Sequence, residues 1–389
     1  MTTLAAPERP APAAAGDRNP IVVTGATGFL GRRVAASLAF DGHAMRCLLR
    51  GSSDAGPLEQ AVGGRVDLSL VRLDFRDQDA LTEAMRGADT LLHLAAGLSG
   101  STSALFASGP VATRKLLHAA ADAGIGRVVL ISSLGVYGAS LLRSGQTLDE
   151  STPIDPNAAA RDPYSYSKVR QEEVARRVAE ERGLDLVVIR PGVIFGEGRP
   201  TISSRAGLPL GGLLVQMGGR QLMPYTYVEN CADAVAAAAT APTAAGQTIN
   251  ILDDDLPTAS GLVRTVRQMG KPVRRLWVPG PLVPTACAVY HWYSRVSGGQ
   301  LPPVLTRYRA KSMWKPVAYS NAKAKRVLGW APRVSMTEAI GRTVAAELGQ
   351  DSPRPGDPKS GDPKSGDPGA GPVSPGRSTS QSPHSAPAT

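Results

Sequence analysis

The sequence of 389 residues contains only three cysteines and no cluster of cysteine and histidine residues. Cys47, Cys231 and Cys287 are far apart, and an odd number of thiols cannot form a complete set of disulfide bonds. Their spacing matches no zinc-binding pattern. We therefore expect three buried, reduced thiols in a cytoplasmic protein, and no metal site.

Long apolar runs are also absent. No stretch approaches the roughly 18 apolar residues that a membrane-spanning helix requires. The first residues, MTTLAAPERPAPAAAGDRN, contain no uninterrupted apolar core followed by a small-residue cleavage site. We therefore expect no export signal and no membrane span.

Large apolar residues are scarce at both ends of the chain. Residues 1–19 are rich in alanine and proline, and residues 349–389 are rich in proline, glycine and serine with a short G-D-P-K-S repeat. Such segments bury too little apolar surface to offset the entropy lost on ordering. We predict that both ends are disordered and that the ordered part spans residues 20–348.

Acidic residues are missing from one long segment. Between Arg264 and Arg326 there are thirteen lysines and arginines but no aspartate or glutamate, and this exceeds the net charge of +10 of the whole chain. One interpretation is an ordinary solvated face. The other is a positive field that attracts an anionic ligand: a dinucleotide phosphate, a carboxylate, an acyl carrier or an anionic membrane surface. No nucleic-acid-binding motif accompanies the charge, so we expect no nucleic-acid partner.

The sequence is instead dominated by an alternation of apolar runs and helical patterns. The apolar runs predict strands at 21–24, 44–50, 68–75, 89–97, 127–133 and 184–192, and the helical patterns cover 32–42, 77–86, 103–123 and 163–182. Strands that are apolar throughout and alternate with helices form a parallel sheet covered on both faces. We predict an α/β fold with a doubly wound parallel sheet of the Rossmann type over residues 20–192. A small substrate-binding region follows over residues 193–348.

A glycine-rich turn joins the first predicted strand to the first helix. The segment TGATGFLG (24–31) contains Gly25, Gly28 and Gly31. The first glycine permits a tight turn, the second lets a pyrophosphate approach the backbone, and the third lets the helix pack closely on the strand. Amide groups at the helix N-terminus then face the phosphates. This placement predicts a dinucleotide site.

The end of the second predicted strand indicates which dinucleotide binds. An acidic residue there would accept hydrogen bonds from the ribose of NAD, whereas an arginine suits the 2′-phosphate of NADP. This strand ends in Arg50, Arg32 is a second cation just after the glycine turn, and no acid follows until Asp54. We predict NADP(H) in preference to NAD(H).

Eight motifs in order resemble the extended short-chain dehydrogenase/reductases. This family of NAD-dependent epimerases and dehydratases includes sugar-nucleotide epimerases, 3β-hydroxysteroid dehydrogenases and flavonoid reductases. The resemblance covers residues 20–345. The motifs are TGATGFLG (24–31), LDFRD (73–77), HLAAG (93–97), ISSLGVYG (131–138), PYSYSK (163–168), RPGVIFG (190–196), YVENCADAV (227–235) and YSNAKAKRVLGWAP (319–332).

The resemblance implies a role for each residue at a matching position. Asp74 and Phe75 would lie beside the adenine, although without the resemblance Asp74 would be interpreted as a helix cap or turn residue. Ser133 would be the catalytic serine, with Ser132 as the alternative. Leu94, Ala95 and Ala96 would line the cofactor, and Pro191 and Val193 would flank the nicotinamide amide. The full implied cofactor-binding set is Gly25, Thr27, Gly28, Phe29, Leu30, Gly31, Arg32, Arg50, Asp74, Phe75, Leu94, Ala95, Ala96, Tyr164, Lys168, Pro191 and Val193.

The segment PYSYSK offers two tyrosines as partners of one lysine. Residues four apart on a helix share a face and residues two apart do not, so Tyr164 rather than Tyr166 faces with Lys168. An ammonium group near a phenol lowers the phenol's pKa from about 10 toward the range of a general acid or base. We therefore predict that Ser133, Tyr164 and Lys168 are catalytic.

Three further features bear on the reaction. Family dehydratases carry an acidic pair where this chain has Leu134 and Gly135, and Gly192 replaces an asparagine that many sugar-nucleotide epimerases have. The apolar, aromatic stretch 276–304 suits a hydrophobic or ring substrate, a packed helix or an amphipathic contact with a membrane surface.

We predict hydride transfer between the nicotinamide and a ketone or secondary alcohol of a small molecule, which includes anionic or carrier-linked compounds. The alternatives are a sugar-nucleotide epimerase or reductase, and a non-catalytic, cofactor-binding regulatory protein. A homodimer would use the predicted helices 103–123 and 163–182.

Overall fold

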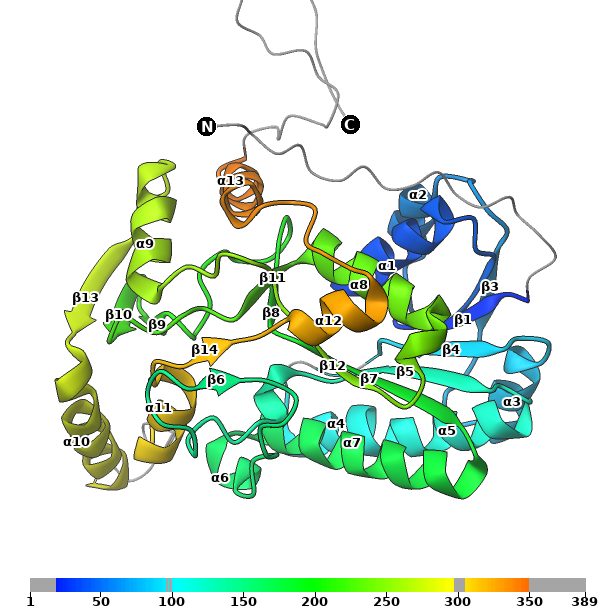
Figure 1. Cartoon of the computed structure of the whole chain (residues 1–389), viewed down its shortest axis with the longest axis horizontal. Coiled ribbons are helices and arrows are strands. Elements are labelled where there is room, and N and C mark those ends of the chain that lie inside the picture. Colours follow the sequence, from blue (N-terminus) through cyan, green and yellow to red (C-terminus); the bar gives the residue numbers. More distant parts are fainter. Residues whose placement is uncertain (1–18, 96, 98–99, 297–304, 350–389) are drawn as a thin grey trace, which may run out of the picture. The chain divides into compact units, whose positions relative to one another are not determined.

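The computed structural model describes residues 19–95, 97, 100–296 and 305–349. The ends that we predict to be disordered therefore lie outside the described residues, except Asn19 and Gly349. The main element is a seven-stranded sheet in the order β12-β7-β5-β4-β1-β2-β3, in which every neighbouring pair is parallel (Figure 1). Its strands are β1 (Ile21–Thr24), β2 (Met45–Leu49), β3 (Leu68–Arg72), β4 (Thr90–His93), β5 (Arg127–Ile131), β7 (Asp185–Pro191) and β12 (Thr248–Ile251).

Helices cover both faces of this sheet, as the apolar strands predict. One face packs against α1 (Phe29–Phe40), α2 (Gly56–Val62) and α8 (Val228–Thr240), and the other against α3 (Gln78–Met85), α5 (Ala112–Asp122) and α7 (Pro163–Arg182) (Figure 1). Alternate residues of β1 show the pattern, because Val23 belongs to the first core and Val22 to the second. The doubly wound Rossmann fold is confirmed.

All six predicted strands are present, but two predictions about helices and strands need correction. The helix predicted over 103–123 is three pieces: α4 (Thr102–Phe106), a π-helical segment η1 (Ala107–Val111) and α5. Pro110 lies inside η1 and has no N–H to donate, which favours the wider turn. The sequence predicts no strand of the central sheet beyond residue 192, yet β12 pairs with β7. The four residues of β12 adopt the strand conformation because they pair with β7.

A second, smaller group of elements lies outside the seven-stranded sheet. Its three-stranded sheet has the order β13-β10-β9, with β9 (Gly207–Leu210) antiparallel and β13 (Arg274–Val278) parallel to β10 (Leu213–Met217). Two short parallel pairs join β8 (Val193–Phe195) to β11 (Tyr225–Tyr227), and β6 (Thr147–Leu148) to β14 (Ala318–Tyr319). The remaining elements are η2 (Leu134–Val136), α6 (Ala158–Arg161), η3 (Pro242–Ala244), α9 (Ala259–Gln268), η4 (Gly280–Leu282), α10 (Val283–Val296), α11 (Arg307–Trp314), α12 (Ala322–Leu328) and α13 (Met336–Glu347).

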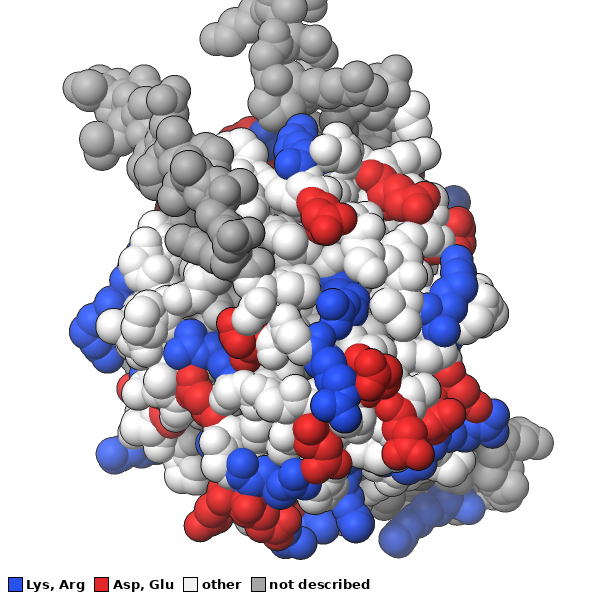
Figure 2. Space-filling view, turned by 90° about the vertical axis from the view of Figure 1, so that its right-hand side faces the viewer, with Lys and Arg blue, Asp and Glu red and all other residues white. Residues whose placement is uncertain are grey.

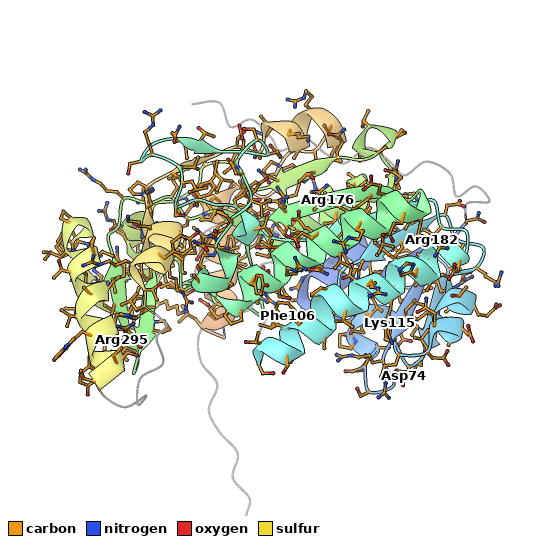
Figure 3. All side chains as sticks on the ribbon, turned by 90° about the horizontal axis from the view of Figure 1, so that it is seen from below. Asp74, Phe106, Lys115, Arg176, Arg182 and Arg295 are labelled. Atoms are coloured by element: carbon orange, nitrogen blue, oxygen red, sulfur yellow. The ribbon has the colours of Figure 1, made fainter. Side chains whose placement is uncertain are left out.

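The apolar interior contains all three cysteines. Cys47 and Cys231 lie in the core around α1 and α8, and Cys287 lies between α10 and α11. All are unpaired thiols, as predicted, and burial raises the pKa of the Cys47 thiol to about 12. Among the described helices, none has the length and apolar composition needed to cross a bilayer. Helices α5 and α7, the predicted dimer surface, pack against each other (Figure 3), and the dimer stays a prediction.

A buried ion pair joins α7 to the sheet. Arg190 on β7 donates from Nε and Nη2 to the two carboxylate oxygens of Glu172, at 2.9 and 2.6 Å, and both side chains are 5% exposed. The Arg190 guanidinium carbon also lies 4.5 Å from the ring centroid of Tyr137, whose hydroxyl donates to Asn250 on β12. This network connects α7, β7, β12 and the loop after β5 behind the cavity described below.

Replacing Arg190 with methionine should therefore destabilise the fold strongly. The substitution leaves the Glu172 carboxylate buried without its main partner, which typically costs about 3–5 kcal/mol in the free energy of unfolding. Arg86→Met is the control, because the Arg86–Glu83 pair is 61% and 77% exposed and should contribute less than about 1 kcal/mol. Denaturant unfolding measures both variants, and equal losses would contradict the role assigned to the buried pair.

Candidate active site

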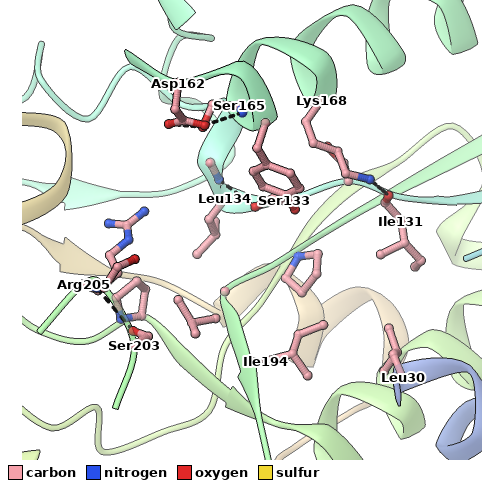
Figure 4. A pocket seen from close by; sticks show the side chains of 18 of the residues that line it. Leu30, Ile131, Ser133, Leu134, Asp162, Ser165, Lys168, Ile194, Ser203 and Arg205 are labelled. Atoms are coloured by element: carbon pink, nitrogen blue, oxygen red, sulfur yellow. Dashed lines mark hydrogen bonds between the residues drawn. The ribbon is translucent and has the colours of Figure 1, made fainter. Parts of the chain in front are cut away.

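A cavity of about 550 Å³ lies at the carboxyl ends of the central strands. Ligands of doubly wound sheets bind at this edge. Leu30 and Ile194 lie across the cavity from Ser133 and Lys168 (Figure 4). The predicted site residues that line it are Gly25, Gly28, Phe29, Leu30, Gly31, Leu94, Ser133, Tyr164, Lys168, Pro191 and Val193.

The glycine turn has the geometry that its sequence predicts. Gly25 has a φ of 76°, and a Cβ there would lie 2.7 Å from the backbone nitrogen of Ala95. A Cβ on Gly31 would lie 2.1 Å from the carbonyl oxygen of Gly25. Gly28 forms the N-terminal boundary of α1, is exposed and provides no side-chain cap for the first helical amides. The turn thus presents bare backbone to the cavity.

Ser133 lies two residues after the end of β5 and is the N-terminal cap of the short helix η2. Its hydroxyl oxygen accepts a hydrogen bond from the Gly135 amide at 3.0 Å, and the residue lines the cavity together with Tyr164. Ser132 is 3% exposed, and its amide donates to the carbonyl oxygen of Ile189. Both serines line the cavity, so the choice of Ser133 over Ser132 stays a prediction.

Tyr164 lies in the first turn of α7, and an N-terminal cap fixes that turn. The Asp162 carboxylate accepts from the amide and the hydroxyl of Ser165, at 2.7 and 3.0 Å (Figure 4). Pro163 occupies the first helical position, where a missing N–H has no cost. The local sequence D-P-Y-S therefore starts the helix and aims Tyr164 at the cavity.

The expected effect of Lys168 on Tyr164 does not occur in this structure. Burial raises the pKa of Tyr164, and the neighbouring Ser133 side chain offsets only part of that rise. Lys168 instead donates from Nζ to the carbonyl oxygen of Ile131 and to Oε1 of Gln171, both at 2.8 Å. Burial lowers the pKa of Lys168 to about 8. Burial thus has the largest effect on the pKa of each group.

A buried polar chain continues from Lys168 beneath the cavity. Gln171 donates to the hydroxyl of Thr113, which pairs with Nε2 of His93 at 2.9 Å. Nδ1 of His93 pairs with the hydroxyl of Thr24 on β1, also at 2.9 Å. Burial lowers the pKa of His93 to about 3, so the ring is neutral. These contacts join α7, α5, β4 and β1, and the sequence analysis did not identify them.

Six described residues of the predicted cofactor set lie outside the cavity lining: Thr27, Arg32, Arg50, Asp74, Phe75 and Ala95. Arg50 is exposed at the end of β2, and Nη1 of Arg72 donates to the carbonyl oxygens of Arg50, Gly51 and Ser53, which holds this loop in one conformation. Nε of Arg32 is buried without a hydrogen-bond partner. Thr27 lies within the glycine turn, and Ala96 lies outside the described residues.

Asp74 and Phe75 follow β3. Asp74 is exposed and pairs with Arg76, with Nη2 and Oδ2 2.7 Å apart, and this pairing lowers the pKa of the Asp74 carboxyl to about 2 (Figure 3). Asp77, not Asp74, caps α3 by accepting from the amide of Ala80. Phe75 packs partly buried against the core beside α3. The adenine contacts of both residues stay predictions.

Four arginines in the cavity wall were missed by the sequence analysis. Arg161, Arg199, Arg205 and Arg309 come from α6, from loops before β9 and from α11. The guanidinium carbon of Arg199 lies 4.6 Å from the ring centroid of Phe29, and Arg161 is buried with Nη1 3.1 Å from Asp155. Because no shared motif marks these positions, only the tertiary structure brings them together.

The aromatic stretch that suggested a hydrophobic substrate lies elsewhere. Trp277, Trp292 and Tyr293 are 55%, 63% and 47% exposed, and no described residue of 276–296 lines this cavity. Residues 297–304 lie outside the described part. The cavity's apolar wall comes instead from Ile131, Leu134, Pro191, Val193, Ile194, Pro224 and Met313.

Adding a methyl group at Gly28 should weaken cofactor binding without unfolding the protein. A Cβ there would lie 3.1 Å from the carbonyl oxygen of Gly25, so the turn can adjust slightly, but bare backbone is lost where phosphates approach. We expect the dissociation constant of NADP(H) to rise about tenfold in Gly28→Ala, roughly 1.4 kcal/mol. Fluorescence titration of bound nucleotide measures it.

The control is Gly126→Ala, at an exposed position with no atom within 4 Å of the added methyl group. Unchanged affinity in Gly28→Ala, with the melting temperature also unchanged, would show that the phosphates bind elsewhere.

Comparisons with known proteins agree with this architecture. The chain is 32% identical over 181 residues to cinnamoyl-CoA reductase 1 of Petunia hybrida, which covers 45% of this chain and 54% of the relative. It is 28% identical over 361 residues to 2-alkyl-3-oxoalkanoate reductase of Stenotrophomonas maltophilia, which covers 84% and 98%. The chain thus spans about half the length of the cinnamoyl-CoA reductases that it matches.

Solved structures show the same fold. The crystal structure of gox2253 has a TM-score of 0.70 and 27% identity, covering 85% of this chain and 98% of that one. UDP-glucuronic acid 4-epimerase of Bacillus cereus, at 18% identity, has a TM-score of 0.63, with 85% and 99% covered. The family model described as NAD dependent epimerase/dehydratase family matches residues 21–251, more than half of the chain. The chain therefore belongs to this family, among the extended short-chain dehydrogenase/reductases.

Proposed function

We propose that the protein is an NADP(H)-preferring oxidoreductase that interconverts a ketone and a secondary alcohol. The observation that carries the proposal is one cavity lined by Ser133, Tyr164 and Lys168 on one side and by the glycine turn on the other. A bound nicotinamide supplies the hydride for reduction and takes it up in the reverse direction. The chain's own residues bind and orient the reactants and move the proton.

Tyr164 is the proposed general acid for reduction. Burial keeps its pKa above the ordinary value, so the hydroxyl holds its proton at neutral pH. As the carbonyl carbon gains a hydride, the carbonyl oxygen takes the Tyr164 proton and the product is the neutral alcohol. The Ser133 hydroxyl lines the same cavity and is proposed to donate a hydrogen bond to the same oxygen.

Lys168 is proposed to hold the nicotinamide ribose and to position Tyr164. With a pKa of about 8, its ammonium is charged at neutral pH. The two acceptors that it contacts, the carbonyl of Ile131 and the amide of Gln171, leave one of its three protons for a ribose hydroxyl. These contacts also fix α7 against the end of β5.

The preference for NADP(H) is proposed from three arginines. Arg50 is exposed at the end of β2, and Arg32 has a buried Nε without a partner, as a group that awaits an anion would. Arg72 already organises the loop after β2 through its bonds to the carbonyls of Arg50, Gly51 and Ser53. A 2′-phosphate at this loop would accept hydrogen bonds that a ribose hydroxyl cannot.

Arg50→Asp should therefore reverse the cofactor preference. We expect the ratio of kcat/KM with NADPH to that with NADH to fall at least tenfold, because the carboxylate repels the 2′-phosphate and accepts from a free ribose diol. Arg86→Asp, an exposed change of equal charge at the end of α3, is the control. An unchanged ratio in Arg50→Asp would refute the assignment.

The substrate that best fits the cavity is a ketone with an apolar or ring body and an anionic group. The apolar wall near Ile131 and Ile194 suits the body, and the arginines suit a carboxylate, phosphate or carrier-linked anion. Arg205 supports this most directly. It lines the cavity and has no acidic partner among the described residues. The name 2-alkyl-3-oxoalkanoate reductase describes such a compound for one relative.

A sugar-nucleotide epimerase or reductase is the second candidate. The same arginines favour it, since a diphosphate is also anionic. An epimerase returns the hydride and consumes no cofactor, so the two candidates differ in net NADPH oxidation. The third alternative, a cofactor-binding protein without turnover, is disfavoured by the complete Ser133, Tyr164 and Lys168 set.

Tyr164→Phe should abolish turnover and leave cofactor binding intact. Losing a general acid typically lowers kcat by about 100- to 10,000-fold, whereas the phenyl ring keeps its packing. NADPH absorbance with a panel of 3-oxo acids, their thioesters and neutral ketones measures the rate. Tyr166→Phe is the matched control, because that ring packs against Phe106 and does not line the cavity.

Full activity in Tyr164→Phe would refute the catalytic assignment. Turnover of sugar nucleotides without net NADPH loss would support the second candidate instead. Tight cofactor binding by the native protein with no turnover of any substrate would support the third.

A further inference from the structure

Exposed apolar side chains are concentrated in one segment. The described part of the chain has thirteen large apolar side chains that are exposed, and seven of them lie between residues 276 and 296. They are Leu276, Trp277, Leu282, Val289, Trp292, Tyr293 and Val296, each 47–63% exposed. Contiguous exposure of this kind marks a binding surface more often than scattered single residues do.

Helix α10 is apolar on both of its sides. Val283 and Cys287 are buried against α11 and neighbouring elements. Val289, Trp292, Tyr293 and Val296, at spacings of three and four residues, form a second stripe that faces outward. A helix at the surface of a globular protein normally has polar residues on its outer side. We therefore expect the outer stripe of α10 to bind an apolar partner.

Cations adjoin this apolar surface at Trp277. This residue borders two adjoining cavities: one is lined by Arg264, Arg267 and Arg275, and the other by Arg220, Arg307, Lys311 and Lys315. The second cavity has a volume of about 1170 Å³, and its apolar wall includes Pro281, Val283 and Trp314. No described residue that lines either cavity is acidic. The partner should accordingly be anionic as well as apolar.

We propose that the α10 face docks on an anionic lipid bilayer. This face consists of Trp277, Leu282, the outer stripe of α10 and the seven cations that line the two adjoining cavities. Tryptophan and tyrosine favour the boundary between headgroups and acyl chains, and lysine and arginine bind anionic headgroups. A second copy of the chain fits poorly, because a two-fold interface would bring two positively charged faces without acidic residues together. Figure 2 views the opposite end, where Lys and Arg are interspersed with Asp and Glu.

Docking in this way would bring the bilayer close to the catalytic cavity. Helix α11 separates the two, with Arg309, Ser312 and Met313 lining the catalytic cavity and Ala310, Lys311 and Trp314 lining the apolar one. Figure 1 shows α10 and α11 as neighbours at one edge of the molecule, and Figure 3 shows Arg295 on α10 at that edge. The proposal does not depend on the reaction, because membrane binding is measured without substrate.

Co-sedimentation of the full chain with vesicles tests the proposal. We expect binding to vesicles of phosphatidylcholine mixed with phosphatidylglycerol, at least tenfold weaker binding to phosphatidylcholine alone, and loss of binding at high salt. Arg275→Glu should lower the partition coefficient about tenfold, and Trp292→Ser several-fold. Two variants away from the α10 face are the controls. Arg86→Glu makes the same change of charge as Arg275→Glu, and Val111→Ser removes an apolar side chain about as exposed as that of Trp292.

Fluorescence quenching tests the orientation in the native protein, whatever the variants do to folding. Two of the four tryptophans, Trp277 and Trp292, are exposed, whereas Trp314 and Trp330 are 6% exposed. Lipids brominated on the acyl chains should quench the native protein and leave Trp277→Phe/Trp292→Phe unquenched. No binding to anionic vesicles, binding without quenching, or binding unchanged in Arg275→Glu would overturn the proposal. So would a dimer that Trp292→Ser dissociates, or a soluble acidic protein that competes for the surface.

Discussion

The attachment of α7 to the central sheet is the constraint on which the candidate active site depends. Glu172 and Arg190 form a buried ion pair, and one turn earlier Lys168 bonds the carbonyl of Ile131 at the end of β5. A buried charge without a partner is costly, so these contacts hold the helix in one position along the strands. Tyr164, in the first turn of the same helix, is thereby fixed beside Ser133 at the strand ends.

Burial of the side chains between α7 and the sheet also determines their protonation states. The same loss of water keeps Tyr164 protonated, lowers the pKa of Lys168 to about 8 and keeps His93 neutral. The polar chain through Gln171 and Thr113 satisfies hydrogen-bonding groups that would otherwise be unpaired. A phenol that holds its proton and an ammonium that can lose one are both suited to proton transfer near neutral pH.

The α10 face, on the far side of α11, is separate from the candidate active site. Its apolar and cationic residues do not reach the cavity that contains Ser133 and Tyr164, although the stretch 276–304 first suggested a substrate wall. The apolar side chains and the cations of this segment thus lie mainly on an outward-facing surface of the protein. The cavity's own positive charge comes mainly from Arg161, Arg199 and Arg205, outside that segment.

The sequence by itself determined the α/β class, the glycine turn and the choice of Tyr164 over Tyr166, because these depend on residues close together in the chain. Periodicity of 2 and of 3.6 residues and the demands of a tight turn are local. Only the tertiary structure decided that β12 joins the sheet, that Lys168 bonds Ile131 and Gln171, and that arginines from separate segments share one cavity. Those facts depend on which distant segments pack together and on how much water each group loses, and local patterns contain neither.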